Sequence, residues 1–415
     1  MLLQMILRLK MNTIKSRIKK AIKDHKTFKG SFVCDIATSY CLSLMIYRGY
    51  SKSIANNEFY LSKIKNPIVK FHVASSLFLC GDYNNAMLKL LDIIAKFPQH
   101  AESYYLLADI YLISGKKDKA KEILELLLTK STRLKTWLQL ANMVDTKNEF
   151  EDLLLLWNQE KLSGRLHPYH FEVNGYIATA ALRAKQYAHS EKIWLDFIES
   201  IKNEKAFFPI KSDKTLSTQS APEALRNLKV VLDNSGVEFF LISGTLLGCI
   251  RDNKFLGHDK DIDVGIWNDI DKESVITALS TSGLFHINSI RSEHVIRIKH
   301  VNGVAIDLFI HYREENNYWH GGVKLKWNNT PFQLKEKKFI GEKFKIPSNY
   351  DLYLRENYGD WKKIVKKFDS AFDTPNSTIL NKNEMRAHAF KLLAVSMHRK
   401  DWEECDELLI KLESI

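Results

Sequence analysis

Apolar residues recur at helical spacing between residues 61 and 204, and the pattern repeats itself along the chain. The segments VASSLFLCGDYNNAM and LADIYLISGKKDKAK coincide when one is shifted by about 34 residues, the period that is typical of tetratricopeptide repeats. In this alignment small residues match small residues: Ala74 matches Ala108, Gly81 matches Gly115, and Ala86 matches Ala120. Small side chains at these positions let two helices cross closely, so the pattern predicts helical hairpins.

Two further units extend the pattern. The segment LQLANMVDTKNEFEDLL, around Ala141, continues it one residue short, and IATAALRAKQYAHSEKIWLDF, with Ala181 and Ala188, gives a looser fourth unit. We predict four hairpins over residues 61–204, stacked as a short solenoid. The concave side of such a solenoid is an interaction surface for another protein, an acceptor chain or the rest of this chain.

The pattern changes after residue 204. Residues 205–220 contain the polar, aperiodic segment IKSDKTLSTQS and are predicted to be a linker. PEALRNLKVVLDNSGV then has helical spacing, and a strand-like FFLI, a Gly-Thr turn, a short helix LLGCIRDN and a second strand DIDVGIW follow. We therefore predict an α+β chain, with an all-α solenoid, a mixed-sheet domain over 221–380 and a helical hairpin over 381–415. The hairpin resembles one more repeat unit, which either packs on the solenoid or caps the sheet domain.

Residues 1–60 are predicted to form basic helices, the first of them amphipathic. Ile14, Ile18 and Ile22 are spaced for one helix face, with lysines between them. The segment has no small-residue cleavage site, so we do not expect a cleavable signal peptide. The first helix can rest on an anionic membrane surface, as polybasic interfacial helices do, or pack its isoleucines on the next domain.

Composition narrows the class of protein. The 415 residues are 45% hydrophobic and 27% charged, with a net charge of +12, which suits a globular protein of two or three domains. No apolar run approaches the roughly 18 residues of a membrane span. The basic residues are not interleaved with aromatic ones, so nucleic acid is not an expected partner. A cytoplasmic location fits best, because the cysteines are odd in number and scattered, without disulfide or zinc spacing: Cys34, Cys41, Cys80, Cys249 and Cys405.

The candidate chemistry lies in the second predicted strand. Asp259, Asp261 and Asp263 occupy alternate positions there, so their carboxylates should crowd on one face of the strand. Crowded carboxylates repel one another, and a divalent cation removes that cost. Asp307 is the only Asp, Glu, Lys or Arg in the strand-like run VAIDLFIHY, which can lie beside the first strand. Two strands that bring aspartates together predict a Mg²⁺ or Mn²⁺ site that handles phosphates.

The elements around these aspartates match a known fold. A helix, a strand, a Gly-Thr turn and Asp-x-Asp on the next strand form the core of the nucleotidyltransferase fold. In this fold Gly244 and Thr245 are expected to receive a diphosphate, because glycine lets the backbone approach and the following helix offers free N–H groups.

A longer stretch then resembles the LicD/fukutin family. GTLLGCIRDNKFLGHDKDIDVGI is similar to the family motif of Gly-Thr/Ser-Leu-Leu-Gly, an arginine and an aspartate cluster. IRIKHVNGVAIDLFIHY resembles the family's third-aspartate strand, and FKIPSNYDLYLRENYGDW resembles its tyrosine-rich ending. The resemblance covers about residues 220 to 378.

This resemblance implies a metal-dependent phosphotransferase. Its donor would be CDP-activated, of the CDP-ribitol, CDP-glycerol or CDP-choline type. Its acceptor would be a cell-surface glycan, such as capsule, a teichoic-type polymer or lipopolysaccharide. His258, just before the aspartates, is similar to the fukutin branch and favours an alditol-phosphate donor.

Each candidate residue then has an expected role. Asp261 and Asp263 would hold the metal against the donor diphosphate. Asp307 would complete the metal shell or act as base on the acceptor hydroxyl, and Asp259 would be a ligand or support one.

The cationic candidates carry alternatives. Arg251 would pair with a phosphate oxygen in bidentate fashion, or else balance Asp252. Arg297 and Lys299 alternate on one face of a predicted strand, and they would touch the nucleotide or simply form an exposed edge.

Two other functions use the same features. The alternative is a non-catalytic repeat adaptor whose nucleotidyltransferase-like domain only binds nucleotide or glycan. Three mutually repelling carboxylates argue against it, because a site without turnover has no need of them. Transfer of a nucleotide to protein or RNA would use the same aspartates, but the family-like tail after Asp307 argues against that reaction.

Overall fold

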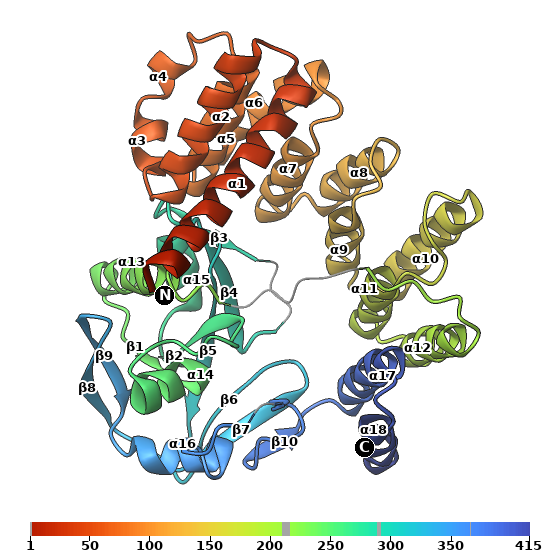
Figure 1. Ribbon diagram of the computed structural model, residues 1–415, viewed down its shortest axis with the longest axis vertical. Helices are drawn as coiled ribbons and strands as arrows, with labels where there is room; N and C mark the ends of the chain where they lie inside the picture. The colour runs from red at the N-terminus through yellow and green to blue at the C-terminus, as the bar shows by residue number, and fades with distance from the viewer. Residues whose placement is uncertain (1, 210–215, 289–291, 366) are drawn as a thin grey trace.

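The computed structural model describes residues 2–209, 216–288, 292–365 and 367–415 (Figure 1). The predicted linker at 205–220 lies partly outside these residues. The first part of the chain is helical, as predicted. It comprises α1 (Leu2–Phe28), α2 (Phe32–Tyr47), α3 (Ser51–Asn56), α4 (Glu58–Leu61), α5 (Pro67–Leu79), α6 (Tyr83–Lys96), α7 (Ala101–Ile113), α8 (Lys117–Leu128), α9 (Leu134–Asn142), α10 (Lys147–Leu162), α11 (Phe171–Arg183) and α12 (Tyr187–Lys202).

Helices α5 to α12 form the four predicted hairpins. The small residues that define the repeat are buried where the helices cross: Ala74, Ala86, Ala108 and Ala120 are all 0% exposed. The turns of the first two hairpins each place a glycine in the left-handed region, at Gly81 with φ 83° and Gly115 with φ 69°. Glycine takes this conformation without the steric cost of a side chain, which explains its recurrence there.

The fourth hairpin departs from the prediction. Lys185, with φ 57°, occupies its left-handed turn position. Ser190, 1% exposed, takes the buried place at the crossing, while Ala188 is exposed. The prediction that Ala188 is the small residue of this crossing was therefore wrong. The position of the turn, and not the spacing of the alanines, decides which small residue lies at the crossing.

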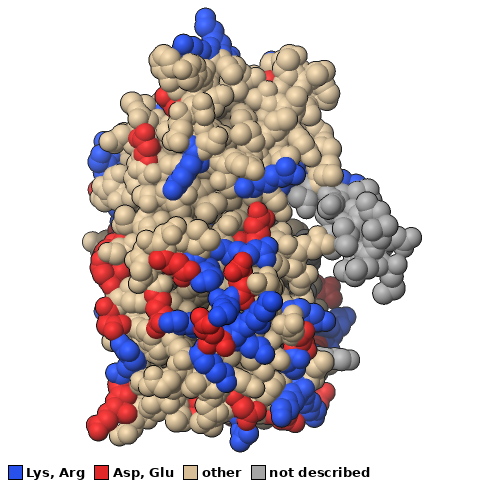
Figure 2. All heavy atoms as spheres, turned by 90° about the vertical axis from the view of Figure 1, so that its left-hand side faces the viewer, with Lys and Arg blue, Asp and Glu red and all other residues tan. Residues whose placement is uncertain are grey.

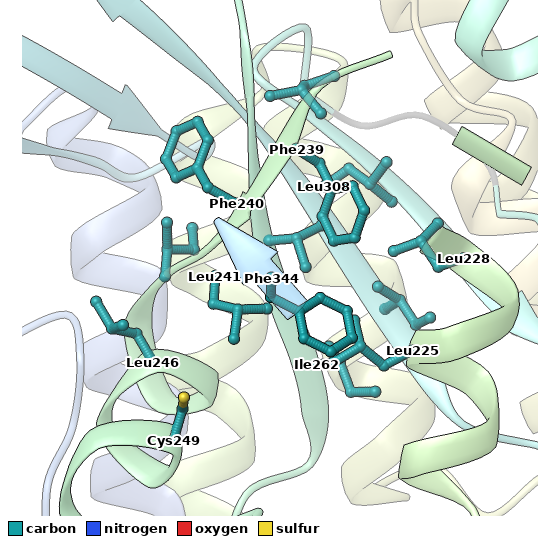
Figure 3. Packing of buried hydrophobic residues seen from close by; sticks show 14 of the residues in the cluster. Leu225, Leu228, Phe239, Phe240, Leu241, Leu246, Cys249, Ile262, Leu308 and Phe344 are labelled. Atoms are coloured by element: carbon teal, nitrogen blue, oxygen red, sulfur yellow. The ribbon is translucent and has the colours of Figure 1, made fainter. Parts of the chain in front are cut away.

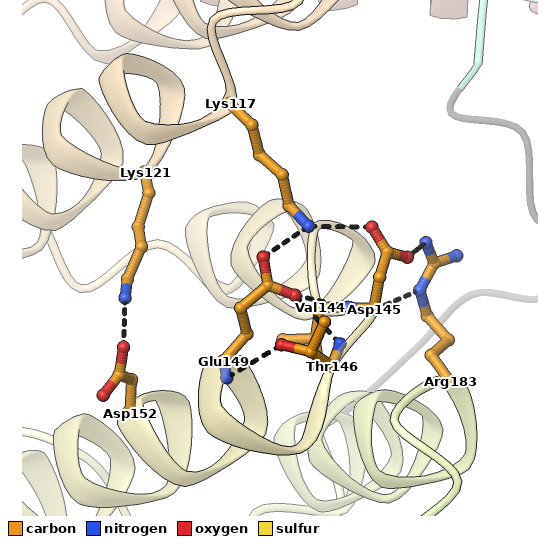
Figure 4. Close-up of polar contacts among 8 residues, drawn as sticks. All are labelled: Lys117, Lys121, Val144, Asp145, Thr146, Glu149, Asp152 and Arg183. Carbon is orange, nitrogen blue, oxygen red and sulfur yellow. Dashed lines mark hydrogen bonds and ion pairs between the residues drawn. The ribbon is translucent and has the colours of Figure 1, made fainter.

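Ion pairs connect one repeat to the next along the solenoid (Figure 4). The Lys117 ammonium lies 2.8 Å from Asp145 Oδ2 and 2.6 Å from Glu149 Oε1. Arg183, from the following hairpin, reaches the same Asp145 at 2.5 Å and donates to the Val144 carbonyl at 2.7 Å. Three successive hairpins are thus linked through one loop.

The C-terminal hairpin completes the solenoid. Helix α17 (Lys382–Arg399) packs against α12, and α18 (Trp402–Ser414) packs against α17. Ala389, Phe390 and Ala394 lie in the same apolar core as the repeats. Arg386 adds a 2.8 Å ion pair to Glu191. Of the two predicted placements, the structure shows packing on the solenoid.

Helix α1 is present, but it buries a different face from the one its isoleucines suggested. Ile14 and Ile18 remain 42% and 40% exposed. The buried positions nearby are Arg17, which donates to the Ser43 carbonyl, and Asp24, which accepts a 2.5 Å hydrogen bond from Ser39. These side chains are paired, as buried polar groups must be.

The second part of the chain forms the predicted mixed sheet. Its elements are α13 (Ala221–Asn234), β1 (Phe239–Leu241), α14 (Ser243–Leu247), the π-helical turn η1 (Gly248–Asp252), β2 (Asp261–Trp267), α15 (Lys272–Ser280), β3 (Phe285–Ile287), β4 (Val295–His300), β5 (Ala305–Arg313), β6 (Tyr318–Gly321), β7 (Leu325–Asn329), β8 (Leu334–Phe339), β9 (Glu342–Pro347), α16 (Tyr350–Tyr358) and β10 (Ser377–Ile379). The strand order is β10-β7-β6-β5-β2-β1-β9-β8, and β4 lies against β5 and β3. Pairs β2/β5 and β1/β9 are parallel and the others are antiparallel.

The core of this domain lies between the sheet and helix α13 (Figure 3). Leu225 and Leu228 of α13 meet Leu241, Ile262 and Leu308, all 0% exposed, from three neighbouring strands. Strands buried on this face hold the register of β2 and β5, because a slip by one residue would turn their apolar side chains away from α13.

The solenoid meets the sheet domain at both of its ends. At the first hairpin the Gly283 N–H donates to the Leu79 carbonyl at 2.8 Å, and Phe78 stacks on His286 with ring centroids 5.7 Å apart. At the C-terminal end Leu325 of β7 packs with Met385 of α17. The repeats therefore form an arch over the sheet domain (Figure 1).

Charge on the outer surface is mixed. Figure 2 shows Lys and Arg among Asp and Glu over the sheet-domain half of one face. Pairs such as Lys343 with Glu336, at 2.7 Å, account for part of this mixture. Among the described helices, none combines the length and the apolar character that a membrane crossing needs.

The shared core gives a stability prediction. Phe390→Ala should lower the free energy of unfolding by about 3 kcal/mol, because a buried phenylalanine leaves a cavity when truncated. Phe390 is 6% exposed, whereas Phe59 is 64% exposed, so Phe59→Ala is the matched control and should cost less than about 1 kcal/mol. Urea unfolding followed by circular dichroism measures both. Equal losses in the two variants would contradict the packing of the C-terminal hairpin.

Candidate active site

The aspartates of the Asp-x-Asp motif and Asp307 lie on adjacent strands. Asp261 is the first residue of β2, Asp263 follows on the same face, and Asp307 lies in β5. The parallel register places Asp263 directly beside Asp307. On the opposite face of the same two strands, Ile262 and Ile306 are 0% exposed. The apolar core thus holds the carboxylates together, on the side of the sheet away from α13.

Asp259 differs from the prediction in its position. It precedes β2 and lies in the loop, where its carbonyl accepts a 2.6 Å hydrogen bond from the Leu216 N–H. Its carboxylate lies against Gly244. A Cβ at Gly244 would be 2.6 Å from Asp259 Oδ2, so only glycine fits while the carboxylate stays in place.

The turn before α14 brings backbone groups to the aspartates. Ser243 has φ 47°, a left-handed conformation that is unusual for a residue with a side chain and is found at functional turns. The backbone N–H of the next residue, Gly244, acts to lower the pKa of Asp263. Thr245 is 2% exposed, and its hydroxyl accepts a 2.9 Å hydrogen bond from the Asp263 N–H. The structure thus places Thr245 behind the strand, where it positions Asp263, instead of on the surface where a diphosphate would bind.

The carboxylates destabilise one another's charge. Burial raises the pKa of Asp261 to about 6, and the nearby charges of Asp307 and Asp259 add to the effect. Burial and then the charges of Asp261 and Asp307 raise the pKa of Asp263 well above its usual value. Burial also raises the pKa of Asp307, against the lowering influence of Arg297. Loss of solvation is the largest cause in each case, and repulsion by neighbouring carboxylates adds to it at Asp261 and Asp263.

The cationic candidates fall into two groups. Arg297 of β4 lies opposite Asp307 in the antiparallel register, and its Nε donates to Asp307 Oδ2 at 3.0 Å. Lys299 follows on the same strand and is exposed. Arg251 of η1 is paired with its neighbour Asp252 at 3.3 Å, which is the balancing contact that the sequence left open. Arg251, Lys299 and His258 all line the cavity described below.

Sequence reasoning missed the tyrosines of α16. Tyr353 is 2% exposed, and its buried hydroxyl has no hydrogen-bond partner within the described part of the chain. Burial, followed by the charge of Asp263, raises the pKa of both Tyr353 and Tyr358. The segment YDLYLRENYGDW signalled these residues by its tyrosine content, but only the packing of α16 shows that they face Asp263.

A cavity of about 2220 Å³ opens over the aspartates. The turn residues Ser243 and Gly244 line it together with all four site aspartates. The opposite wall comes from the repeats, including residues of α7, α9 and α11. Pockets for single small molecules usually measure about 300 to 1,000 Å³, so this cavity can hold more than a nucleotide.

The donor set fits a hard divalent cation in its chemistry. Buried carboxylate oxygens that repel one another are the groups a Mg²⁺ or Mn²⁺ ion neutralises. Across the described ranges, no three His, Cys, Asp or Glu side chains are arranged so that they could hold a metal ion. The Arg297 guanidinium is paired with Asp307, so its positive charge acts at the carboxylate where a bound metal cation would act.

Comparison with known proteins agrees with this geometry. Residues 236–349 match the family model described as "LicD/FKTN/FKRP, nucleotidyltransferase domain", and residues 89–122 match "Tetratricopeptide repeat". The resemblance inferred from the sequence motifs is thereby confirmed for both parts of the chain.

Curated relatives match part of the chain. The chain is 31% identical over 196 residues to "Ribitol-5-phosphate transferase FKTN" of Homo sapiens and, to the same extent, of Macaca fascicularis. The mouse protein of the same name is 29% identical over 174 residues. The human alignment covers 43% of this chain and 42% of the relative, so the chain spans about two fifths of the length of that protein.

Repulsion at Asp261 predicts a pH-dependent stability in metal-free buffer. Its pKa is raised from 3.8 to about 6, so the folded state binds more protons than the unfolded state between these values and stability falls as pH rises through them. Asp261→Asn should be more stable than the wild type at pH 7, by on the order of 1 to 2 kcal/mol after solvent screening. The difference should vanish below about pH 4. Chemical unfolding in EDTA at several pH values measures it.

A matched control separates this effect from a general loss of charge. The Asp269 side chain is 62% exposed, so Asp269→Asn should change stability little at any of these pH values. A destabilised Asp261→Asn at pH 7 would contradict the electrostatic strain assigned to the site.

Proposed function

We propose that this chain, whose residues 236–349 match the LicD/FKTN/FKRP nucleotidyltransferase domain, is a metal-dependent phosphotransferase. It moves an alditol-phosphate or phosphocholine-type group from a CDP-activated donor to a cell-surface glycan. The observation that carries this proposal is the placement of Asp261, Asp263 and Asp307 on two neighbouring strands beside the Gly244 turn. Named relatives that transfer ribitol 5-phosphate favour the alditol-phosphate donor.

The donor diphosphate would lie between the aspartates and the turn. A Mg²⁺ or Mn²⁺ ion held by Asp261, Asp263 and Asp307 would neutralise charge on the diphosphate and on the departing CMP. Gly244 has no side chain, so phosphate oxygens can come close to the backbone there. Arg297, now on Asp307, carries a delocalised charge that suits a phosphate oxygen once the carboxylate is otherwise neutralised.

The acceptor hydroxyl needs a base within reach of the donor phosphorus. The pKa of Asp307 is raised by burial, which strengthens it as a proton acceptor relative to an exposed aspartate. We assign it to take the hydroxyl proton as the new phosphodiester bond forms and CMP leaves. The Arg297 guanidinium opposes that rise in pKa.

Loss of the motif aspartates should abolish turnover. With Mg²⁺ and CDP-ribitol, Asp261→Asn and Asp263→Asn should each lower CMP release at least about 100-fold, because the charge on the diphosphate is no longer offset. Asp269→Asn, in the same domain but away from the site, should release CMP as the wild type does. Chromatography of the nucleotide products measures all three.

Two results would point elsewhere. Unchanged release in the Asp261 and Asp263 variants would refute the metal assignment. Nucleotide binding by the wild type without release under any condition would favour the repeat adaptor.

Melting temperatures measured with a small panel of nucleotide-linked donors test which donor the protein prefers. CDP-ribitol and CDP-glycerol should raise the melting temperature of the wild type in Mg²⁺ more than CDP-choline does, because the relatives transfer an alditol phosphate. Differential scanning fluorimetry with CDP and UDP-glucose as controls measures the shifts. A response to UDP-glucose alone would rule out the CDP donor.

A further inference from the structure

We propose that the inner face of the repeats is the far wall of the acceptor site, and that a neutral saccharide chain lies between this wall and the aspartates. This deepens the proposed function and rests on it. The juxtaposition that carries it is a single cavity with the reaction carboxylates on one side and the concave helices on the other.

The two walls line one cavity. Asp109 of α7, Gln139 of α9 and Tyr176 of α11 line the same cavity as Asp261 and Asp307. Its volume of about 2220 Å³ is more than twice what a single small ligand usually occupies. After a donor nucleotide is bound, the space that remains extends along the repeats.

The walls are held at a fixed separation. The arch is attached to the sheet domain at Gly283 and Leu79 on one side and through Leu325 and Met385 on the other. Within the cavity the charge of Lys135, on α9, contributes to the lowered pKa of His286, on β3, so side chains of the two parts are near each other. A ligand long enough to span the cavity from the aspartates can therefore touch the repeats.

The repeat wall offers an unused hydrogen-bond acceptor. Gln139 Nε2 donates to Asp109 Oδ1 at 3.1 Å, and only the N–H₂ end of an amide can face a carboxylate in this way. Gln139 Oε1 is then buried and has no hydrogen-bond partner among the residues that the structure describes. Such a group in a ligand cavity calls for a donor, and a saccharide hydroxyl supplies one.

Apolar and aromatic groups flank this amide. Leu138 and Ile113 are 37% and 50% exposed and line the cavity. Tyr176 and Trp194 lie farther along the same wall, and the Tyr176 hydroxyl donates to Glu172 at 3.2 Å. Alternating apolar surface and polar acceptors suits a sugar, whose C–H faces and hydroxyl groups alternate in the same way.

Charge on the wall favours a neutral chain over a polyanion. Lys117 is already paired with Asp145 and Glu149 (Figure 4). Lys135 and, on α17, Lys391 also line this wall, and Asp109, Glu172 and Glu384 face the same space. A chain of phosphates or a nucleic acid would need an excess of cations here, and the wall has none.

The test uses two matched pairs of variants in the full chain. Leu138→Arg and Gln139→Leu change the inner wall. Leu155→Arg and Gln159→Leu place the same changes on α10, at exposed residues that do not line the cavity. Binding to a glycan array of neutral and phosphorylated oligosaccharides is measured together with binding to a peptide library. Melting temperatures with and without CDP-ribitol report folding and the donor site separately.

The wild type and both outer variants should bind neutral saccharides, and the inner variants should bind them at least about tenfold more weakly. In transfer assays the loss should fall on KM for the saccharide, because the wall lies away from the reacting atoms. Equal binding by inner and outer variants, preference for peptides, or failure of the wild type to bind any neutral saccharide would overturn the inference. Saccharide binding that follows the inner wall without a CDP-ribitol effect would contradict the proposed function alone.

Discussion

Repulsion between buried carboxylates is the constraint around which this structure is arranged. Asp261 and Asp263 share one face of β2, and the parallel register sets Asp307 of β5 beside them. Alternate residues on both strands are fully buried against α13, so the strands cannot shift to separate the charges. The Gly244 N–H and the Arg297 guanidinium offset part of the cost. Such stored electrostatic strain is characteristic of sites that bind cations and phosphates.

The surroundings of this strained centre are equally constrained. A side chain at Gly244 would displace the Asp259 carboxylate that lies against it, and Ser243 adopts a left-handed conformation just before it. Thr245 fixes the backbone of Asp263 from behind. These contacts hold the turn in place before any ligand arrives, which lowers the reorganisation that binding requires. The turn at residues 243–245 and the aspartates of β2 are far apart in the sequence, and each holds the other in position.

The repeats place this centre inside a cavity instead of on an open surface. They arch over the sheet domain (Figure 1). The C-terminal hairpin of α17 and α18 shares the apolar core of the repeats, beside the fourth hairpin. A continuous apolar core runs from α7 to α18, which makes the far wall of the cavity stiff. Because the wall and the aspartates are joined at both ends of the arch, the shape of the cavity is a property of the whole fold.

The sequence by itself determined the features that depend on local pattern. Small residues at a fixed period predicted the hairpins, and the Gly-Thr turn with Asp261, Asp263 and Asp307 predicted the two-strand site. Contacts between distant segments were decided only by tertiary structure. They place the C-terminal hairpin on the repeats, turn Thr245 inward, set Arg297 on Asp307 and bring Tyr358 toward Asp263. Periodicity reports which face of an element is apolar, but the partner of that face is chosen by packing among all elements at once, and no local pattern encodes it.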